Sequence, residues 1–215
     1  MGYFPVMLDV TSRPVVVVGS GTAAVAKIER LLAAEALVAV FDQRPDCPLP
    51  PAMRDTVHWF PRWPEPADVK GAALVILAHE DGAVNRRLLS TVRQTAVLVN
   101  VVDQPALSDC IMVSHLRRGP LVVSVSTSGW APGMARRIRE ALESLFDDQW
   151  PERLERVRQV RLNVREERDG VEARERIRVA EDRAWTSWQE ALRHTGGDWH
   201  HHALGSPRGG RPGEP

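Results

Sequence analysis

The stretch 15–27, V-V-V-V-G-S-G-T-A-A-V-A-K, carries glycines at a spacing that could bind phosphate groups. Gly19, Gly21 and Ala24 follow the pattern G-x-G-x-x-A directly after four β-branched residues. In this pattern the first glycine allows a sharp turn, the second lets the backbone approach a pyrophosphate, and the small third residue lets a helix pack closely on the strand. Free N–H groups at the helix start then favour the phosphates. The stretch predicts a dinucleotide site; the alternative is a plain strand-to-helix turn.

A carboxylate follows at the distance expected for ribose recognition. Asp42 comes after the apolar run L-V-A-V-F, roughly 20 residues beyond Gly21, where such folds place an acidic residue that accepts hydrogen bonds from ribose hydroxyls. Because a carboxylate disfavours a 2′-phosphate, Asp42 favours NAD over NADP; the alternative is a solvated loop aspartate. We expect the cofactor to contact Gly19, Ser20, Gly21, Thr22, Ala23, Asp42, Ala78, His79 and Val102.

Two further apolar runs end on polar residues. The run at 72–78 is followed by His79 and Glu80, and the run V-L-V-N-V-V at 97–102 is followed by Asp103. Residues at the carboxyl ends of parallel strands face the ligand crevice of such folds. Asn100 interrupts the second run, and a buried amide normally needs defined hydrogen-bond partners.

Hydrophobic periodicity places these residues on an α/β framework. Buried strands are predicted at 15–18, 37–41, 72–78 and 97–102, with helices from about Thr22 and through 84–92. Weaker strand candidates are 4–8 (an edge strand or an extended lead-in), 111–113 and 121–125. A loop of small and hydroxylic residues at 127–133 leads into a helix whose first N–H groups could bind a carboxylate or a phosphate. The alternation of strands and helices predicts a Rossmann-type parallel sheet.

Length, charge and cysteine usage exclude several classes of function. The 215 residues, 43% of them hydrophobic, allow one sizeable core or one domain plus a smaller one. Lys+Arg and Asp+Glu balance at 28 each, so no global field attracts nucleic acid or a membrane. The first residues lack a signal peptide and no window approaches ~18 apolar residues, so we expect a cytoplasmic protein. Cys47 and Cys110 indicate two unpaired thiols in a reducing compartment and no metal site.

The C-terminal part changes in composition. Residues 151–194 are rich in Arg and Glu, and Asp169-Gly170 predicts a break between two helices. Because opposite charges are interspersed, a solvated helical face is favoured, with an RNA-binding surface as the alternative. The segment from Thr195 is typical of disorder. Its three-histidine run at 200–202 is incidental or binds metal weakly.

The order of these motifs resembles the siroheme synthase N-terminal module over roughly residues 3 to 190. The resemblance rests on N-V-V-D-Q-P at 100–105, I-M at 111–112 and S-T-S-G-W-A-P at 126–132. It is supported by the F-P-V start, Lys27 after the glycine pattern, Val84-Asn85 after the third strand, and A-R-x-x-R-E-x-L-E at 135–143. That family comprises precorrin-2 dehydrogenases, some of which are also sirohydrochlorin ferrochelatases.

The resemblance implies NAD-dependent dehydrogenation of precorrin-2 to sirohydrochlorin in siroheme biosynthesis, with insertion of ferrous iron (or cobaltous ion) as a further activity of some members. It also implies a homodimer. The domains it implies are an NAD-binding Rossmann domain at 1–113, a small dimerisation segment at 114–149, a helical region at 150–194 and a disordered tail at 195–215.

The family pattern also assigns residues to the chemistry. The aspartate of N-V-V-D, which corresponds to Asp103, is the family's residue most closely tied to catalysis. A carboxylate at a strand end near the nicotinamide could accept a proton from the macrocycle as hydride leaves, or take pyrrole protons before metal entry. The implied substrate contacts are Asn100, Ser114, His115, Thr127 and Ser128, and the alternative for the hydroxyls is ordinary turn and helix-cap hydrogen bonding.

Several residues depart from the family pattern, mostly on the substrate side. Where relatives usually read A-T after the third strand, this chain has Ala78-His79-Glu80; His79 could crowd or replace a nicotinamide contact, or titrate near neutral pH. The other departures are Glu35, the segment C-I-M-V at 110–113, His115 and Trp130. They leave two alternatives: a metal chelatase without dehydrogenase activity, using His79, His115 and Asp103, and a non-catalytic nucleotide- or tetrapyrrole-binding protein.

Overall fold

The computed structural model describes residues 2–165 and 170–194, and the chain divides into two compact units. Unit 1 comprises Met1–Val113 together with Ser126–Ala131, and unit 2 comprises Ser114–Val125 and the chain from Pro132 onward. The division of the latter part into a dimerisation segment and a helical region stays a prediction. The predicted disorder of 195–215 and its histidine run lie outside the described residues.

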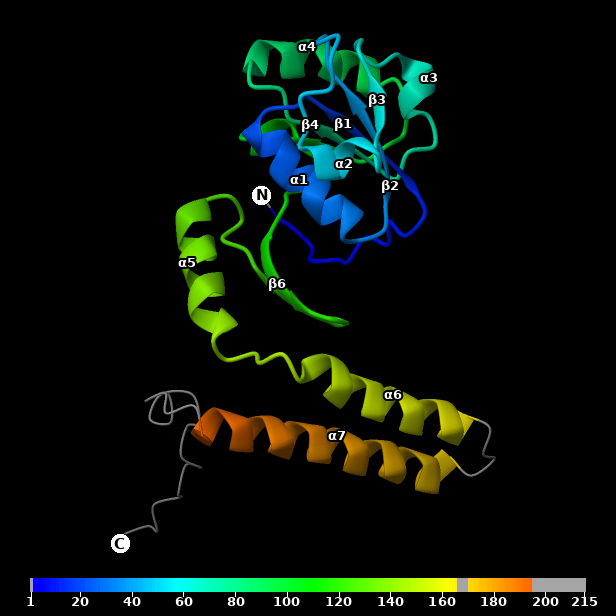
Figure 1. The fold of residues 1–215 in the computed structure, drawn as a ribbon, viewed down its shortest axis with the longest axis vertical. Helices are drawn as coiled ribbons and strands as arrows, with labels where there is room; N and C mark the ends of the chain where they lie inside the picture. Colours follow the sequence, from blue (N-terminus) through cyan, green and yellow to red (C-terminus); the bar gives the residue numbers. More distant parts are fainter. Residues whose placement is uncertain (1, 166–169, 195–215) are drawn as a thin grey trace, which may run out of the picture. The chain divides into compact units, whose positions relative to one another are not determined.

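Unit 1 is built on a five-stranded sheet in which every neighbouring pair is parallel (Figure 1). The strand order is β3-β2-β1-β4-β5, so the chain moves in opposite directions from β1 toward the two edges. Its strands are β1 (Pro14–Val18), β2 (Leu37–Phe41), β3 (His58–Phe60), β4 (Leu74–Leu77) and β5 (Val99–Val101). The predicted Rossmann-type parallel sheet is confirmed. Such folds bind ligands at the carboxyl ends of the strands, where the order reverses.

Helices cover both faces of this sheet because alternate residues of a strand point to opposite sides. Val15 and Val17 pack in one core with Ile28 of α1 (Thr22–Leu32), whereas Val16 and Val18 pack in a second core with Leu88 of α4 (Gly82–Val92). Burial on both sides explains the unbroken run of valines in β1. The remaining elements of unit 1 are the short helices α2 (Pro51–Arg54) and α3 (Pro66–Val69) and a 3₁₀ turn at Pro105–Leu107.

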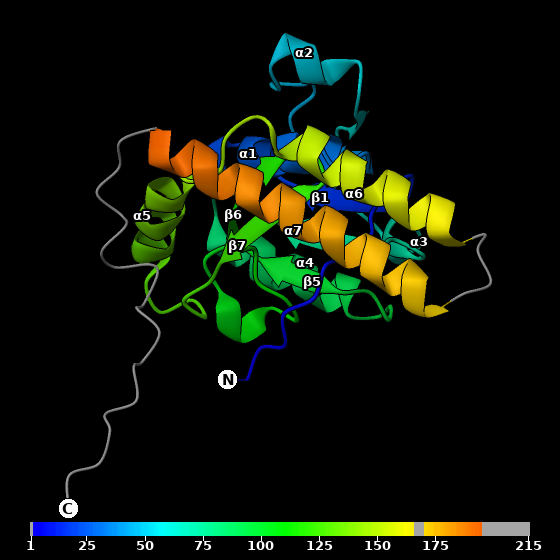
Figure 2. The ribbon, with the colours of Figure 1, turned by 90° about the horizontal axis from the view of Figure 1, so that it is seen from below.

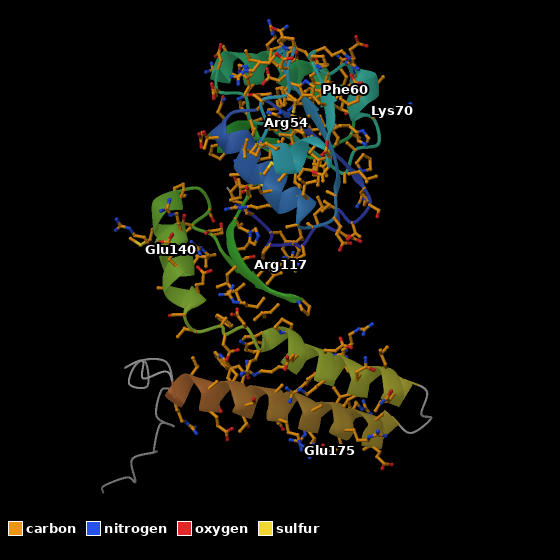
Figure 3. All side chains as sticks on the ribbon, in the orientation of Figure 1. Arg54, Phe60, Lys70, Arg117, Glu140 and Glu175 are labelled. Carbon is orange, nitrogen blue, oxygen red and sulfur yellow. The ribbon has the colours of Figure 1, made fainter. Side chains whose placement is uncertain are left out.

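The aromatic segment after β2 forms the edge of the sheet. Phe60 of β3, labelled in Figure 3, lies on this edge strand. Its ring stacks on that of Phe41 with centroids 4.7 Å apart. Arg62 lies over both rings, 5.3 Å and 5.6 Å from their centroids. These contacts pack the segment against the edge of the sheet.

The structure decides the two weaker strand candidates at 4–8 and 111–113. Residues 4–8 form no strand and Phe4 is 85% exposed, so of the two alternatives the lead-in fits and the edge strand is wrong. The strand predicted at 111–113 is wrong. The strand is β6 (Ser114–Arg118), which pairs antiparallel with β7 (Leu121–Val125). The two-residue Gly119-Pro120 connection sets this register from Arg118 opposite Leu121, and turn geometry therefore outweighs the apolar character of 111–113.

Unit 2 contains this hairpin and three helices. They are α5 (Pro132–Glu143), α6 (Trp150–Arg165) and α7 (Gly170–His194), and α6 and α7 lie side by side (Figure 2). The predicted pair of helices is confirmed. An aromatic cluster joins the start of α6 to α7: Trp188 lies 5.6 Å from Trp150 and 5.7 Å from Phe146 between ring centroids. Charged side chains of α7 pair along the helix, as Glu175 does with Arg178 at 2.6 Å. Glu175 is labelled in Figure 3.

A buried arginine holds the start of α6. Arg153 is 2% exposed, forms an ion pair with Asp147, donates from Nη2 to Gln149 Oε1 at 3.2 Å, and lies over the Trp150 ring at 5.7 Å. Hydrogen bonding to Arg153 is the main reason why the pKa of Asp147 is lowered from its ordinary value, against the opposing effect of burial. A buried guanidinium without its carboxylate is costly.

Asp147→Ala is therefore expected to lower the free energy of unfolding by about 2–3 kcal/mol, at the low end for a broken buried pair because Asp147 is 35% exposed. Since the folded-state pKa is lowered, this stabilisation is complete above the unfolded value near 3.8 and is lost as pH falls through the lower folded value. Urea unfolding at several pH values measures the difference. The matched control is Asp148→Ala, because Asp148 is 99% exposed and should matter little. An equal loss in both variants would contradict the assignment.

No helix in residues 2–165 and 170–194 combines the length and the apolar run needed to cross a lipid bilayer.

Candidate active site

The glycine turn between β1 and α1 has a shape that only glycine fits at its first position. Gly19 has φ +104°, and a Cβ there would lie 2.8 Å from the carbonyl oxygen of Ala78 and from the backbone of His79. Its N–H donates to the carbonyl of Phe41 at 2.8 Å, and Ala78 N–H donates to Val18 O at 2.8 Å. The turn is thereby fixed between the carboxyl ends of β2 and β4.

The N-terminus of α1 is suited to an anion. Gly21 is the N-cap, no side chain caps the helix, and its first turn holds no acidic residue. The first N–H groups of this 11-residue helix have no partner within the helix, and they give its N-terminus a partial positive charge. The glycine turn and the N-terminus of α1 lie at the point where the strand order reverses, which is the position suited to the pyrophosphate of a dinucleotide.

Asp42 is held at the end of β2 by the same turn. Ser20 Oγ donates to Asp42 Oδ2 at 2.6 Å, and Arg44 N–H donates to Asp42 Oδ1 at 3.2 Å. Asp42 is 3% exposed and Ser20 is 6% exposed, so the alternative of a solvated loop aspartate is wrong. The carboxylate lies beside the glycine turn, where the spacing predicted a ribose-binding group.

The segment after β4 is fixed by an amide that sequence reasoning did not assign to the site. Asn85 of α4 is 2% exposed, accepts from His79 N–H at 3.1 Å and donates to His79 O at 2.9 Å. His79 Nδ1 accepts from Asp81 N–H at 3.1 Å, so the neutral imidazole carries its proton on Nε2. The sequence signal that could have identified Asn85 is its place as a polar residue on the otherwise apolar buried face of α4. These contacts lock Ala78 and His79 against the glycine turn.

Asp103 lies in a turn directly after β5. It has φ +59°, a conformation that Asp adopts more readily than most residues, and Gln104 N–H closes the turn on Val101 O at 3.1 Å. Its side chain is exposed. Lys27 of α1 is close enough for Asp103 to act on its pKa: burial lowers that pKa, and the Asp103 charge opposes the change. Lys27 Nζ donates to Ala23 O at 3.4 Å, so its charge lies at the first turn of α1, within electrostatic reach of Asp103.

The predicted substrate contacts fall into different places. Asn100 is 5% exposed and donates to Cys110 O at 2.9 Å, a contact that joins β5 to the irregular segment before β6. Thr127 Oγ1 accepts from Ala131 N–H at 3.1 Å, which is the turn role given as the alternative. Ser128 has φ +53° in the same loop, which belongs to unit 1. Ser114 and His115 belong to β6 of unit 2.

The hydroxyl loop lies beside the Asp103 turn. A Cβ on Gly129 would be 3.8 Å from Pro105 Cβ, two residues beyond Asp103. Trp130 of this loop is 92% exposed. The structure thus brings Thr127, Ser128 and Asp103 into one unit. The catalytic role of Asp103 and the substrate roles of the five predicted contacts stay predictions.

Within residues 2–165 and 170–194, no group of three or more His, Cys, Asp or Glu side chains is arranged to hold a metal ion. Cys47 and Cys110 are free thiols, as predicted. The pKa of Cys110 is raised, chiefly by burial.

Comparisons with known proteins agree with this geometry. A family described as "Putative NAD(P)-binding" matches residues 6–114. The chain is 38% identical over 147 residues to "Siroheme synthase" of Actinobacillus pleuropneumoniae serotype 7 (strain AP76), covering 68% of this chain and 30% of that protein. It is 36% identical over 179 residues to "Siroheme synthase" of Thioalkalivibrio sulfidiphilus (strain HL-EbGR7), covering 82% and 36%. The chain thus spans about a third of the length of these curated relatives.

Among solved structures, "SirC, precorrin-2 dehydrogenase" matches with a TM-score of 0.62 and 21% identity, covering 94% of each chain. This likeness confirms the fold. Together with the matched family and the relatives, it confirms the resemblance drawn from the motifs. The chain belongs to the family described as "Putative NAD(P)-binding", and its relatives agree with the resemblance to the siroheme synthase N-terminal module.

Proposed function

We propose that this chain catalyses the NAD-dependent dehydrogenation of precorrin-2 to sirohydrochlorin. The family supports a dinucleotide cofactor, and the names of the relatives and of the structural neighbour point to siroheme formation and to precorrin-2. The observation that carries the proposal is Asp103: a carboxylate in a fixed turn at the carboxyl edge of the sheet that also bears the glycine turn.

Each part of the site has a defined task in this reaction. When bound, NAD accepts the hydride that leaves the substrate. Asp103 accepts the proton that the macrocycle loses, and releases it to water after turnover. Lys27 supplies an opposite charge within electrostatic reach of that carboxylate. The loop with Thr127 and Ser128 lies beside the Asp103 turn and contributes to the substrate side.

The cofactor is NAD rather than NADP because Asp42 occupies the ribose position. Asp42→Asn removes the charge and keeps the volume, and we expect NAD affinity to fall about tenfold, at the low end for hydrogen bonds to a charged group. NADP affinity should fall less, since the variant no longer repels a 2′-phosphate. Titration calorimetry measures both dissociation constants. The matched control is the exposed Asp46→Asn. Unchanged NAD binding in Asp42→Asn would contradict the ribose contact.

The activity is tested by NADH formation from NAD and precorrin-2 with purified protein. No NADH despite bound NAD would overturn the proposal.

The chelatase activity implied by the family is a prediction with its own assay. Ferrous or cobaltous ion is added to sirohydrochlorin, and formation of siroheme or its cobalt analogue is followed by absorbance. The expected homodimer is tested by sedimentation velocity. The cytoplasmic location also stays a prediction.

A further inference from the structure

The side chain of Glu80 lies directly against the glycine turn. A Cβ placed on Gly21 would be 2.9 Å from both Cγ and Cδ of Glu80 and closer still to Oε1. Neither the N-cap nor the first turn of α1 supplies an acidic side chain, so Glu80 brings a negative charge to this helix start from another element. Negative charge at that position is favourable, and it is the same position that suits a pyrophosphate.

Glu80 also contacts a cation that stands beside the ribose-binding carboxylate. Arg44 Nη2 lies 3.9 Å from Glu80 Oε2, and the backbone N–H of Arg44 donates to Asp42 Oδ1 at 3.2 Å. The side chains of Arg44 and Glu80 are 50% and 68% exposed, so both can move without disturbing the core. An arginine near the ribose is the group that accommodates a 2′-phosphate in dinucleotide-binding folds.

We propose that Glu80 sets the cofactor preference of this chain, an inference that rests on the proposed function. Glu80 competes with the pyrophosphate for the N-terminus of α1, which weakens both dinucleotides. It also neutralises Arg44, which would otherwise pair with the 2′-phosphate of NADP. The chain therefore prefers NAD through two carboxylates: Asp42 at the ribose and Glu80 on the arginine.

Glu80→Gln separates these effects because it removes the charge and keeps the shape. We expect NAD to bind roughly threefold more tightly, the size of a charge effect at a helix start. NADP should gain more, about tenfold or above, because Arg44 becomes free to pair with phosphate. In the double variant Glu80→Gln/Arg44→Gln the threefold gain for NAD should persist, whereas the additional gain for NADP should vanish.

The measurement is titration calorimetry of the full chain with NAD and with NADP, at low and at physiological salt. Glu29→Gln, an exposed charge change on α1 itself, is the matched control and should leave both affinities unchanged. Glu80→Ala provides a second variant, and thermal unfolding checks that each protein is folded.

Two results overturn the inference, and they are distinguishable. If the wild-type chain binds NAD and Glu80→Gln changes neither affinity, or changes both by the same factor, Glu80 does not set the preference and the proposed function stands. If the folded wild-type chain binds neither dinucleotide, the proposed function fails and the inference fails with it.

Discussion

Asp103→Asn is expected to lower kcat for precorrin-2 dehydrogenation by about 10²–10³-fold, the usual contribution of a positioned general base. Asparagine is the informative replacement because it tolerates the positive φ of this turn, whereas alanine would strain it. NAD affinity should stay within about twofold. The groups expected to bind the phosphates and the ribose lie at the start of α1 and at the end of β2, and Asp103 is not one of them. The rate is followed by NADH absorbance and the affinity by calorimetry.

Measuring kcat and NAD affinity side by side separates proton transfer from cofactor binding. Asp55→Asn, an exposed aspartate at the end of α2, is the matched control and should behave as wild type. A drop in NAD affinity with an unchanged kcat would assign Asp103 to cofactor binding instead of proton transfer.

Gly19→Ala is expected to be the most damaging change on the cofactor side. The position combines φ +104° with a Cβ that would meet Ala78 O and the His79 backbone at 2.8 Å, so no side-chain rotation relieves the contact. A strained backbone of this kind costs roughly 3 kcal/mol, and because the turn itself forms the phosphate cradle we expect NAD affinity to fall about 10²-fold.

Gly133→Ala is the matched control for this variant. Gly133 lies in the first turn of α5, has no neighbour within 4 Å of an added Cβ, and does not have a positive φ. Its replacement should leave NAD binding unchanged and stability within about 1 kcal/mol. Wild-type affinity for NAD in Gly19→Ala would show that the turn does not bind the pyrophosphate.

The cofactor half of the site could be predicted from the sequence because its determinants are local. The valine run, the glycine turn and α1 are consecutive, and Asp42 follows at a distance set by one β-α-β unit. The structure adds the Ser20 hydroxyl on Asp42, which depends on how β2 sits beside β1. The contacts of Glu80 with Gly21 and Arg44 were beyond reach because they join the ends of β1, β2 and β4, which only the strand order brings together.

The substrate half was less predictable for a related reason. Asn100 was singled out as a polar residue in an apolar strand, but its partner Cys110 lies outside any periodic pattern, so its contact could not be foreseen. The hairpin strand was placed at 111–113 on apolar content, whereas the turn at Gly119-Pro120 determines that pairing starts at Ser114. Lys27 was noted only as part of a motif, and its proximity to Asp103 required the packing of α1 beside the sheet.

The central claim, hydride transfer from precorrin-2 to NAD, is tested most directly by following both products in one reaction. Purified wild-type chain is mixed with precorrin-2 and excess NAD in the absence of oxygen, and NADH and sirohydrochlorin are measured from their absorption spectra. We expect one NADH for each sirohydrochlorin formed, at a rate that Asp103→Asn lowers by about 10²–10³-fold. Binding of NAD without formation of NADH, or sirohydrochlorin formed without NADH, would contradict the account.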